Sequence, residues 1–305
     1  MLEVTFLGTV AGIPTPKRNH SSIHLKYEDQ CFLFDCGEGT QRQIFSAGLN
    51  FMKISKIFIS HWHADHWAGL IGLIQTMNLE KRQEPLEIYG PEAEKFVDDL
   101  LDMAYWGPRF EIIPKPVNFH GAEIDTIVKT PSFEILSTPV KHSIPAVAYA
   151  FKEKDRVNVD IKKAGELYGL KQGPLIGRLK EKGEIEVKGK KVKLEEVQLI
   201  KPGIKFVFSG DTKPTPNMIR LAEGADVLVH ESTFGNEFED YPDRHHTKAE
   251  DAADIAKKAG VKKLYLTHFS RRYQDVRPLL DEARKVFPNT DAAYDFLKLQ
   301  LKVDK

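Results

Sequence analysis

Three histidines and one aspartate crowd into a single short run, HWHADH. The run follows the apolar segment KIFIS and precedes the helical pattern WAGLIGLIQ, and its polar residues are His61, His63, Asp65 and His66. Polar side chains at the end of a strand need partners, because burying a polar group without one costs free energy. Neutral imidazole and carboxylate are good ligands for metals such as Zn²⁺, and a tight loop lets alternate residues point at different ions. The pattern favours a metal site, with a histidine-rich surface loop as the alternative.

Further candidates of the same kind stand just past other apolar runs. The runs are FEILSTPV, KFVFSG, DVLV and KLYLT, and the residues are, in the same order, His142, Asp211, His230 and His268. In layered α/β proteins the ends of strands line a common edge, where side chains from distant segments can converge. Taken singly, His142 could cap a turn, Asp211 could be an ordinary loop residue, and His268 could be a buried histidine with a partner. Together they predict one site shared with the HWHADH run.

A framework of strands and helices must hold these side chains. Apolar runs with β character alternate with segments whose apolar residues recur at helical spacing. We expect strands at 3–8, 21–27, 31–36, 56–60, 87–90, 133–140, 205–210, 226–231 and 263–268, and helices at 40–48, 67–80, 92–105, 247–260 and 275–287. This alternation predicts a layered α/β protein with helices outside its sheets.

One segment, 152–199, does not fit this framework. It carries 13 Lys or Arg against 9 Asp or Glu, repeated glycines, and Tyr168 as its single aromatic residue. A segment with so little to bury is not expected to fold as a domain of its own. We therefore interpret the chain as one domain, 1–305, into which 152–199 is inserted as a mobile basic arm. An ordinary surface excursion without function is the alternative.

Composition limits the classes of partner. The 305 residues include 44 basic and 44 acidic side chains. The net charge therefore gives no indication of a nucleic acid or a membrane as binding partner. The first residues, MLEVTFLGT, lack the regions of a signal peptide, and no run is long and apolar enough to span a bilayer. Two cysteines, Cys31 and Cys36, are too few for a disulfide framework. We expect a cytoplasmic protein with no membrane partner.

The motifs resemble those of a known superfamily. HWHADH, the later histidine in VKHS, SGDT and LTHFS are similar, in this order, to the metal-binding motifs of the metallo-β-lactamase superfamily. Within it, four stretches resemble the ribonuclease Z family of tRNA 3′-processing endonucleases: TPKRN, FDCGEGTQRQ, GPLIGRLKEKG inside the arm, and HESTF followed by HHTKAEDAADIA. The resemblance covers nearly the whole chain except the arm. It implies a four-layered αββα sandwich.

The resemblance also implies a ligand set for two Zn²⁺ per subunit, although His and Asp accept Mn²⁺ or Fe²⁺ as well. Every position has the residue type that the motifs require. One ion is assigned His61, His63 and His142, the other is assigned Asp65, His66 and His268, and Asp211 would bridge them.

The implied reaction is removal of the 3′ trailer from precursor tRNA. Two divalent ions would lower the pKa of a water, and the resulting hydroxide would attack phosphorus and leave a 3′-hydroxyl on the tRNA. By resemblance Asp65 is the general base, and His246, the neighbour of His245, is the general acid that protonates the leaving oxygen. Glu231 could hold the His246 imidazole, or it could be a plain helix-associated or solvent-facing residue.

Contacts with RNA are implied at three places. In the arm, the residues suited to phosphates at the tRNA elbow are Lys171, Arg178, Lys180 and Lys182. The loop TPKRN would meet the acceptor end through Lys17, Arg18 and Asn19, with a mere surface turn as the alternative. After the last ligand, Arg271 and Arg272 offer bidentate phosphate contacts, and the sequence does not tell which of them points inward. The resemblance further implies a homodimer.

Two other functions stay open. Another hydrolase of the superfamily, acting on a small phosphodiester, a lactone or a thioester, would use the same kind of metal site. A tRNA-binding or scaffold protein with a vestigial site belongs to a different class, and the intact ligand set speaks against it.

Overall fold

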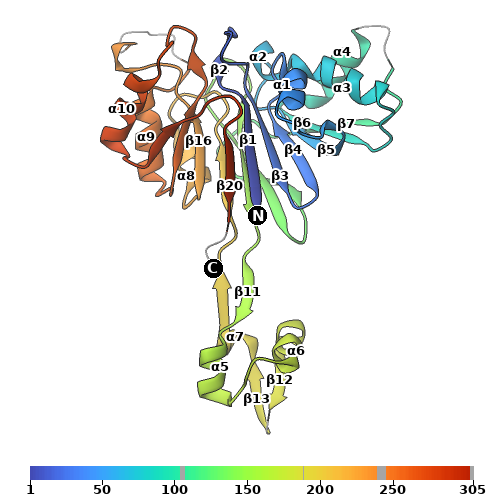
Figure 1. Ribbon diagram of the computed structural model, residues 1–305, viewed down its shortest axis with the longest axis vertical. Helices are drawn as coiled ribbons and strands as arrows, with labels where there is room; N and C mark the ends of the chain where they lie inside the picture. The colour runs from blue at the N-terminus through green and yellow to red at the C-terminus, as the bar shows by residue number, and fades with distance from the viewer. Residues whose placement is uncertain (104–106, 188, 239–244, 303–305) are drawn as a thin grey trace. The chain divides into compact units, whose positions relative to one another are not determined.

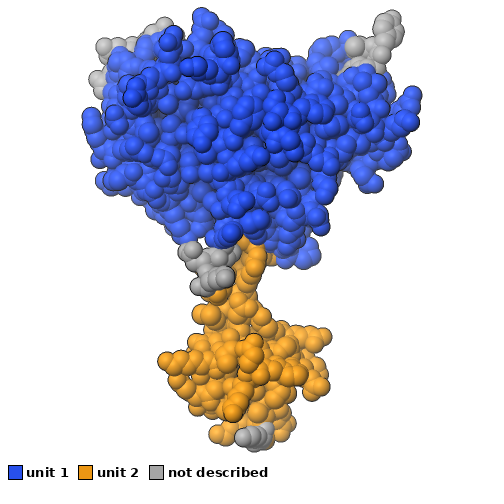
Figure 2. All heavy atoms as spheres, viewed as in Figure 1, with its two compact units in different colours: residues 1–152, 204–302 blue, residues 153–203, 303–305 orange. Residues whose placement is uncertain are grey.

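The computed structural model describes residues 1–103, 107–187, 189–238 and 245–302. The chain forms two compact units, residues 1–152 with 204–302 and residues 153–203, which Figure 2 draws in different colours. No helix in the part of the chain that the structure describes is long and apolar enough to cross a bilayer.

Within the described residues the larger unit contains two seven-stranded sheets, and the first is built mainly from the N-terminal part of the chain. Its seven strands are, in spatial order, β20 (Lys298–Leu301), β1 (Leu2–Gly8), β3 (Ser22–Tyr27), β4 (Gln30–Phe34), β5 (Ile54–Phe58), β6 (Leu86–Gly90) and β7 (Ile112–Pro116). Pairing is antiparallel from β20 to β4 and parallel from β4 to β7. The last strand of the chain thus pairs with the first, with Leu301 opposite Leu2.

The second sheet is built from later segments. Its seven strands are, in spatial order, β19 (Thr290–Ala292), β17 (Leu264–Thr267), β16 (Val227–Glu231), β15 (Lys205–Phe208), β10 (Val147–Glu153), β9 (Phe133–Pro139) and β8 (Asp125–Lys129). β15, β16, β17 and β19 run parallel, whereas β10 pairs antiparallel with β15. Parallel strands bring their carboxyl ends to one edge of the sheet, which is where Asp211 and His268 follow β15 and β17.

Aromatic side chains fill the space between the two sheets. Phe34 of the first sheet packs against Tyr149 and Phe208 of the second, with ring centroids 6.1 Å apart in both pairs. Side chains alternate along a strand, so Leu33 faces the opposite way and joins a separate cluster with the outer helices. The strands therefore read as continuous apolar runs because both of their faces are buried.

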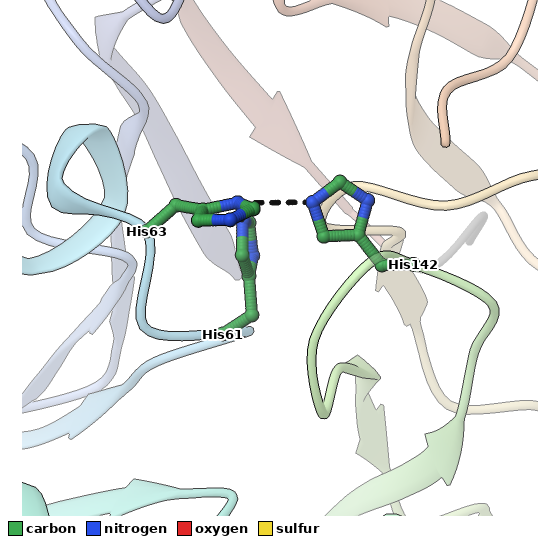
Figure 3. Close-up of side chains that lie close together, drawn as sticks. All are labelled: His61, His63 and His142. Carbon is green, nitrogen blue, oxygen red and sulfur yellow. Dashed lines mark hydrogen bonds between the residues drawn. The ribbon is translucent and has the colours of Figure 1, made fainter. Parts of the chain in front are cut away.

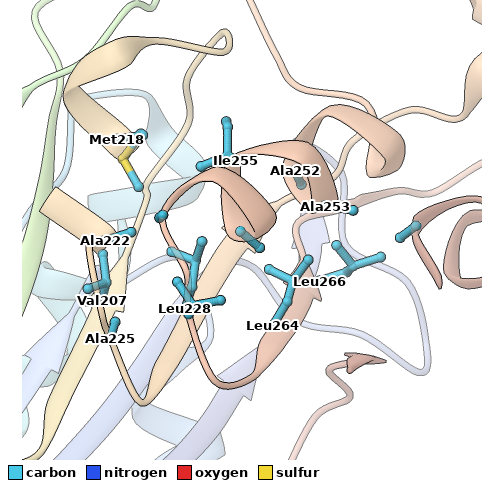
Figure 4. Packing of buried hydrophobic residues seen from close by; sticks show 14 of the residues in the cluster. Val207, Met218, Ala222, Ala225, Leu228, Ala252, Ala253, Ile255, Leu264 and Leu266 are labelled. Carbon is cyan, nitrogen blue, oxygen red and sulfur yellow. The ribbon is translucent and has the colours of Figure 1, made fainter. Parts of the chain in front are cut away.

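Helices cover the outer face of each sheet (Figure 1). On the first sheet lie α1 (Thr40–Ser46), α2 (Ala64–Trp67), α3 (Gly69–Leu79) and α4 (Ala93–Asp102), and on the second lie α8 (Pro216–Ala222), α9 (Ala249–Lys258) and α10 (Arg277–Val286). Small side chains of α9, such as Ala252 and Ala253, let that helix approach Leu264 and Leu266 of β17 closely (Figure 4). The resulting order of layers is helix, sheet, sheet, helix, which confirms the αββα prediction.

The smaller unit corresponds to the inserted arm, with its limits at 153–203. Its elements are β11 (Arg156–Val159), α5 (Ile161–Tyr168), α6 (Pro174–Lys182), β12 (Glu184–Val187), β13 (Lys190–Lys193), α7 (Leu194–Val197) and β14 (Gln198–Lys201). β11 pairs with β14 and β12 pairs with β13. Six buried side chains form a small hydrophobic core: Val159, Ala164, Leu170, Leu179, Val192 and Val197. The segment therefore has a small core, although its composition indicated little to bury.

Candidate metal centre

The HWHADH run turns sharply between β5 and α3. His63 is the N-cap of the short helix α2, and Asp65 and His66 lie on that helix. The turn packs so tightly on the loop after β4 that two glycines are required. A Cβ on Gly69 would stand 2.1 Å from the carbonyl oxygen of Gly37, and one on Gly37 would stand 2.2 Å from that of Asp65. Close backbone contact therefore fixes where the two helical ligand candidates point.

The first group of candidates joins the two sheets. His61 and His63 come from the loop after β5, and His142 comes from the loop after β9. His63 Nδ1 lies 3.1 Å from His61 Nε2 and 3.0 Å from His142 Nε2, so three ring nitrogens face one point (Figure 3).

The second group also draws on both sheets. His66 Nε2 lies 3.3 Å from His268 Nε2, and Asp65 Oδ2 lies 3.4 Å from the first nitrogen and 3.5 Å from the second. His268 itself follows β17 with a φ of 57°, a left-handed backbone conformation that turns its ring back toward the cluster.

Asp211 stands between the two groups. Its Oδ2 lies 3.3 Å from Nε2 of His66, 3.3 Å from Nε2 of His268 and 3.8 Å from Nε2 of His61. Its Oδ1 is buried and has no hydrogen-bond partner among the described residues. A buried carboxylate oxygen without a partner is costly, and a cation would relieve that cost.

Hydrogen bonds around the cluster hold the ring protons on the outside. Asp35 Oδ2 lies 2.6 Å from His66 Nδ1, and the carbonyl oxygen of His245 lies 2.9 Å from His142 Nδ1. These oxygens only accept, so Nδ1 of each ring carries a proton and Nε2 is the nitrogen that faces the centre.

Two hydroxyl oxygens also accept hydrogen bonds from Nδ1 of ligand candidates. Ser60 Oγ donates to Asp35 and is therefore free to accept from His61 Nδ1 at 3.0 Å. Thr233 Oγ1 donates to Glu231 and can accept from His268 Nδ1 at 3.0 Å. Partners of this kind orient metal-bound histidines in proteins.

The donor set fits divalent cations. Burial lowers the pKa of His61 well below its usual value and lowers that of His142 to about 4, so both rings are neutral. Burial also lowers the pKa of His66, but Asp211, Asp35 and Asp65 together raise it well above its usual value. Neutral imidazoles beside carboxylates that attract positive charge are the ligand types that zinc prefers.

A cavity of about 810 Å³ opens over the cluster. The short parallel pair β2 (Val10–Ala11) and β18 (Phe269–Ser270) forms one side, with Ala11 opposite Ser270. The pair carries Gly12 to the rim, where its backbone N–H donates to Asp65 Oδ2 at 2.8 Å. The orientation of the Asp65 carboxylate therefore depends on a segment more than 50 residues earlier in the chain.

His246 lines the same cavity and is held by a buried carboxylate. Its Nδ1 lies 3.0 Å from Glu231 Oε1 and 3.7 Å from Asp211 Oδ2. Burial lowers the pKa of His246, but the charge of Glu231 and its hydrogen bond outweigh this and raise the pKa to about 9. Glu231 is fully buried and also accepts from the backbone N–H of Thr212, which rules out a solvent-facing residue.

The three candidates for RNA contact in the TPKRN loop differ in exposure and in their contacts within the protein. Lys17 is exposed, but Arg18 donates to the carbonyl oxygen of Tyr273 at 3.0 Å and lies over the Phe269 ring. Asn19 is buried, and its side-chain amide donates to the carbonyl oxygen of Glu38. The structure thus gives Arg18 and Asn19 positions that brace the loop.

The remaining candidates are mostly at the surface. Exposed side chains are Lys171, Arg178, Lys180 and Lys182 in the arm and Arg271 and Arg272 beside the cavity. Lys180 also has a partner within the arm, because its Nζ donates a hydrogen bond to Asn158 Oδ1 at 2.8 Å.

His230 does not join the cluster of ligand candidates. It is buried within β16, where its Nδ1 donates to a backbone carbonyl oxygen.

Several residues of the site were missed from sequence. Asp35, Ser60 and Thr233 hold the rings of the ligand candidates, and Gly12 holds Asp65. Ser60 is next to the HWHADH run, and Thr233 lies in the HESTF stretch, so adjacency to a motif was an available signal for both. Asp35 is in the FDCGEG stretch, but nothing in the spacing links it to His66.

Comparisons with known proteins show which family this chain resembles. The family model described as anti-Pycsar protein Apyc1 matches residues 2–104, and the one described as beta-lactamase superfamily domain matches residues 196–269. Ribonuclease Z of Methanothermobacter thermautotrophicus is 43% identical to this chain over 99% of the chain and 97% of its own length. Ribonuclease Z of Pyrococcus abyssi is 42% identical, again over 99% of this chain and 97% of its own length.

Solved structures show the same likeness. The short form of human tRNase Z matches with a TM-score of 0.72 and 26% identity, covering 99% of this chain and 100% of that one. The metallo-beta-lactamase fold protein YhfI from Bacillus subtilis matches with a TM-score of 0.69 at 20% identity, covering 98% of each chain, which is a likeness of fold alone.

Proposed function

This chain belongs to the ribonuclease Z family of the metallo-β-lactamase superfamily, and we propose that it is the zinc-dependent endonuclease that removes the 3′ trailer from precursor tRNA. The observation that carries the proposal is the convergence of two groups of metal-ligand side chains below an open cavity, with Asp211 within 4 Å of members of both. Four of the histidines, His61, His66, His142 and His268, have hydrogen-bond partners on the side of the ring that faces away from the cluster, and a vestigial site would have no need for this support.

The proposed ligands of one cation are His61, His63 and His142, those of the other are Asp65, His66 and His268, and Asp211 is shared. When bound, two such cations supply a hydroxide at neutral pH and draw charge from the phosphate oxygens. The protein residues then have two tasks, which are to orient the attacking water and to protonate the leaving oxygen.

Asp65 is suited to the first task. Its carboxylate lines the cavity, and the Gly12 N–H fixes one of its oxygens at 2.8 Å. A carboxylate held in this way can accept a proton from water without changing its position.

His246 is suited to the second task. Its Nδ1 is held by Glu231, and the ring lines the cavity beside Asp211 and His268. The charge of Glu231 keeps the imidazole protonated, so that it can donate to the leaving 3′-oxygen of the trailer bond.

The arm is proposed as a separate grip on the folded part of the tRNA. Its exposed Lys171, Arg178 and Lys182 lie near the helix α6, whose N-terminal residues Gly173 and Pro174 belong to the family stretch GPLIGRLKEKG. Phosphate contacts of this kind add affinity without reading sequence, and they weaken as salt rises.

The arm can be replaced, together with Ile204 of the larger unit, by a short turn, because Lys152 and Lys205 are cross-strand partners in the antiparallel pair β10 and β15. Replacing residues 153–204 with the two-residue turn Asn-Gly should close a hairpin at this point. This variant should lose cleavage of precursor tRNA and keep hydrolysis of bis(p-nitrophenyl) phosphate. Equal loss on both substrates would count against the proposed role of the arm.

The direct test of the function is incubation of the zinc-loaded protein with a 3′-extended tRNA and mapping of both products at nucleotide resolution. We expect one cut at the 3′ end of the acceptor stem, a 3′-hydroxyl on the tRNA and a 5′-phosphate on the trailer. Hydrolysis of small phosphodiesters, lactones or thioesters without any cut in the tRNA would favour another hydrolase of the superfamily. Binding of tRNA with less than one metal ion per chain would favour the vestigial scaffold.

Three further proposals rest on the family. The metal is Zn²⁺, with Mn²⁺ or Fe²⁺ able to replace it, which metal analysis of protein purified without added ions can decide. The protein acts as a homodimer, which light scattering at several concentrations tests. Its place of action is the cytoplasm, which localisation of the tagged protein in its own cells tests.

A further inference from the structure

Two adjacent arginines follow the last ligand candidate, and their side chains have different surroundings. Arg272 lies over two aromatic rings, with its Cζ 4.4 Å from the centroid of Phe238 and 5.8 Å from that of Phe234. A guanidinium stacked on aromatic faces is held by both electrostatics and packing. Both rings belong to segment 233–238. Its first residue, Thr233, can accept a hydrogen bond from His268 Nδ1.

Arg271 has no such restraint. Among residues 1–103, 107–187, 189–238 and 245–302, no hydrogen bond, ion pair or aromatic stack engages its guanidinium, and the side chain is exposed. Arg271 lines the cavity over the metal cluster and also a second pocket of about 300 Å³. Arg272 lines only the first of these.

The second pocket is suited to an anion. Besides Arg271 its lining includes Lys17 and Arg18, and none of the lining residues that the structure describes is an Asp or Glu. The Arg18 guanidinium is turned toward the Tyr273 carbonyl oxygen and the Phe269 ring. The groups left to meet a phosphate from this pocket are therefore Lys17 and Arg271, and only Arg271 also reaches the cavity where the bond is cut.

We infer that Arg271 binds the phosphate that neighbours the scissile one, so that one nucleotide lies over the metal cluster and the next lies in the second pocket. Arg272 is in contrast a positioning residue, which braces the segment 233–238 and through Thr233 the His268 ring. The inference rests on the proposed function, because it requires an RNA strand that crosses from one pocket to the other. A free guanidinium between the two pockets offers the bidentate donor pair that a phosphate accepts.

The test compares Arg271→Ala, Arg271→Lys, Arg272→Ala and Arg272→Lys in cleavage of a 3′-extended tRNA across a series of KCl concentrations. Arg271→Ala should raise KM about 10-fold to 100-fold, as expected for loss of a charged hydrogen bond, and should reduce the salt slope of log KM by about one. Arg271→Lys should recover the slope, because the charge returns, but not the full KM, because the bidentate geometry does not.

The Arg272 variants should behave differently. Arg272→Ala should lower kcat, keep the salt slope and speed hydrogen exchange in segment 233–238. Arg272→Lys should recover part of kcat, because an ammonium also binds an aromatic face. Arg42→Ala is the matched control, since Arg42 is exposed on α1, lines neither pocket and should leave KM and the slope unchanged.

The outcomes are separable. If the wild-type protein does not cut the extended tRNA, the proposed function fails, and the inference fails with it. If the wild-type protein cuts but Arg271→Ala keeps the salt slope, or Arg272→Ala loses a unit of it, the inference is wrong while the function stands.

Discussion

Asp35 Oδ2 lies 2.6 Å from His66 Nδ1, and both side chains are fully buried. Asp35 also accepts from the backbone N–H of Ser60 at 2.8 Å, so its carboxylate is fixed from two directions. The ring of His66 can therefore present only Nε2 to the centre. This pair shows that the cluster of ligand candidates depends on a residue that is not itself a ligand candidate.

Asp35→Asn tests that dependence. The amide keeps the shape of the carboxylate but loses its charge, and it can turn a donor toward Nδ1 of His66. We expect metal affinity to fall about 10-fold to 100-fold, as is typical for partners of metal-bound histidines. Competition with a chromophoric chelator measures this directly. Asp29→Asn, at an exposed position, is the matched control and should bind metal like the wild type.

Removal of metal should abolish the activity on precursor tRNA and on the small phosphodiester together. Dialysis against a chelator should abolish cleavage of precursor tRNA and of bis(p-nitrophenyl) phosphate, and Zn²⁺ should restore both. The free energy of unfolding should also fall, by about 4 kcal/mol when the metal had been present at 1,000 times its Kd. Denaturant unfolding with and without metal checks this. Full activity in protein shown to be metal-free would contradict the two-metal proposal.

His246→Ala should separate chemistry from metal binding. Loss of the proposed proton donor is expected to lower kcat by about 100-fold to 10,000-fold, while the metal content stays at that of the wild type. His245→Ala is a close control, because His142 bonds to the backbone oxygen of His245 and that oxygen remains after the substitution. A rate for His246→Ala close to that of the wild type would refute the assignment.

The surroundings of Asp295, a residue outside the metal cluster, predict that the free energy of unfolding depends on pH. Burial raises its pKa from 3.8 to about 6, although Asn19 and Thr9 donate hydrogen bonds to it and oppose the shift. Its contribution to stability is therefore fully present below pH 3.8 and is lost as the pH rises through about 6. The shift corresponds to about 3 kcal/mol at most.

Asp295→Asn removes this titration. In denaturant unfolding from acid to neutral pH, the variant should lack the decline in stability that Asp295 contributes between about pH 4 and 6. Identical pH profiles of the two proteins would show that the pKa of Asp295 is not raised. Carbon-detected NMR titration of the wild-type carboxyl groups gives an independent measurement of the same pKa.

The arrangement of the main elements could be predicted from sequence wherever local patterns decide them. The strands before His61, Asp211 and His268 are continuous apolar runs, and the structure has a strand at each of these places. β10 was missed, because Ala148 and Ala150 have low strand propensity. In the sheet these small residues face the helices, and their aromatic neighbours fill the space between the sheets.

The contacts of residues outside the metal-binding motifs could not be predicted from the sequence. Asn19 was expected to meet RNA, yet it is buried against the loop that carries Glu38 and Gly39. The core of the arm was missed because composition averages over a segment, whereas Leu179 and Val192 are brought together by the fold of the arm itself. Which of two neighbouring arginines faces the aromatic rings likewise depends on a segment more than 30 residues earlier.

The pairing of the first strand with the last has a consequence for synthesis on the ribosome. His66 and His268 are 202 positions apart, and the edge of the first sheet closes only when β20 reaches β1. A growing chain therefore cannot bring these two histidines together until residue 268 has left the ribosome.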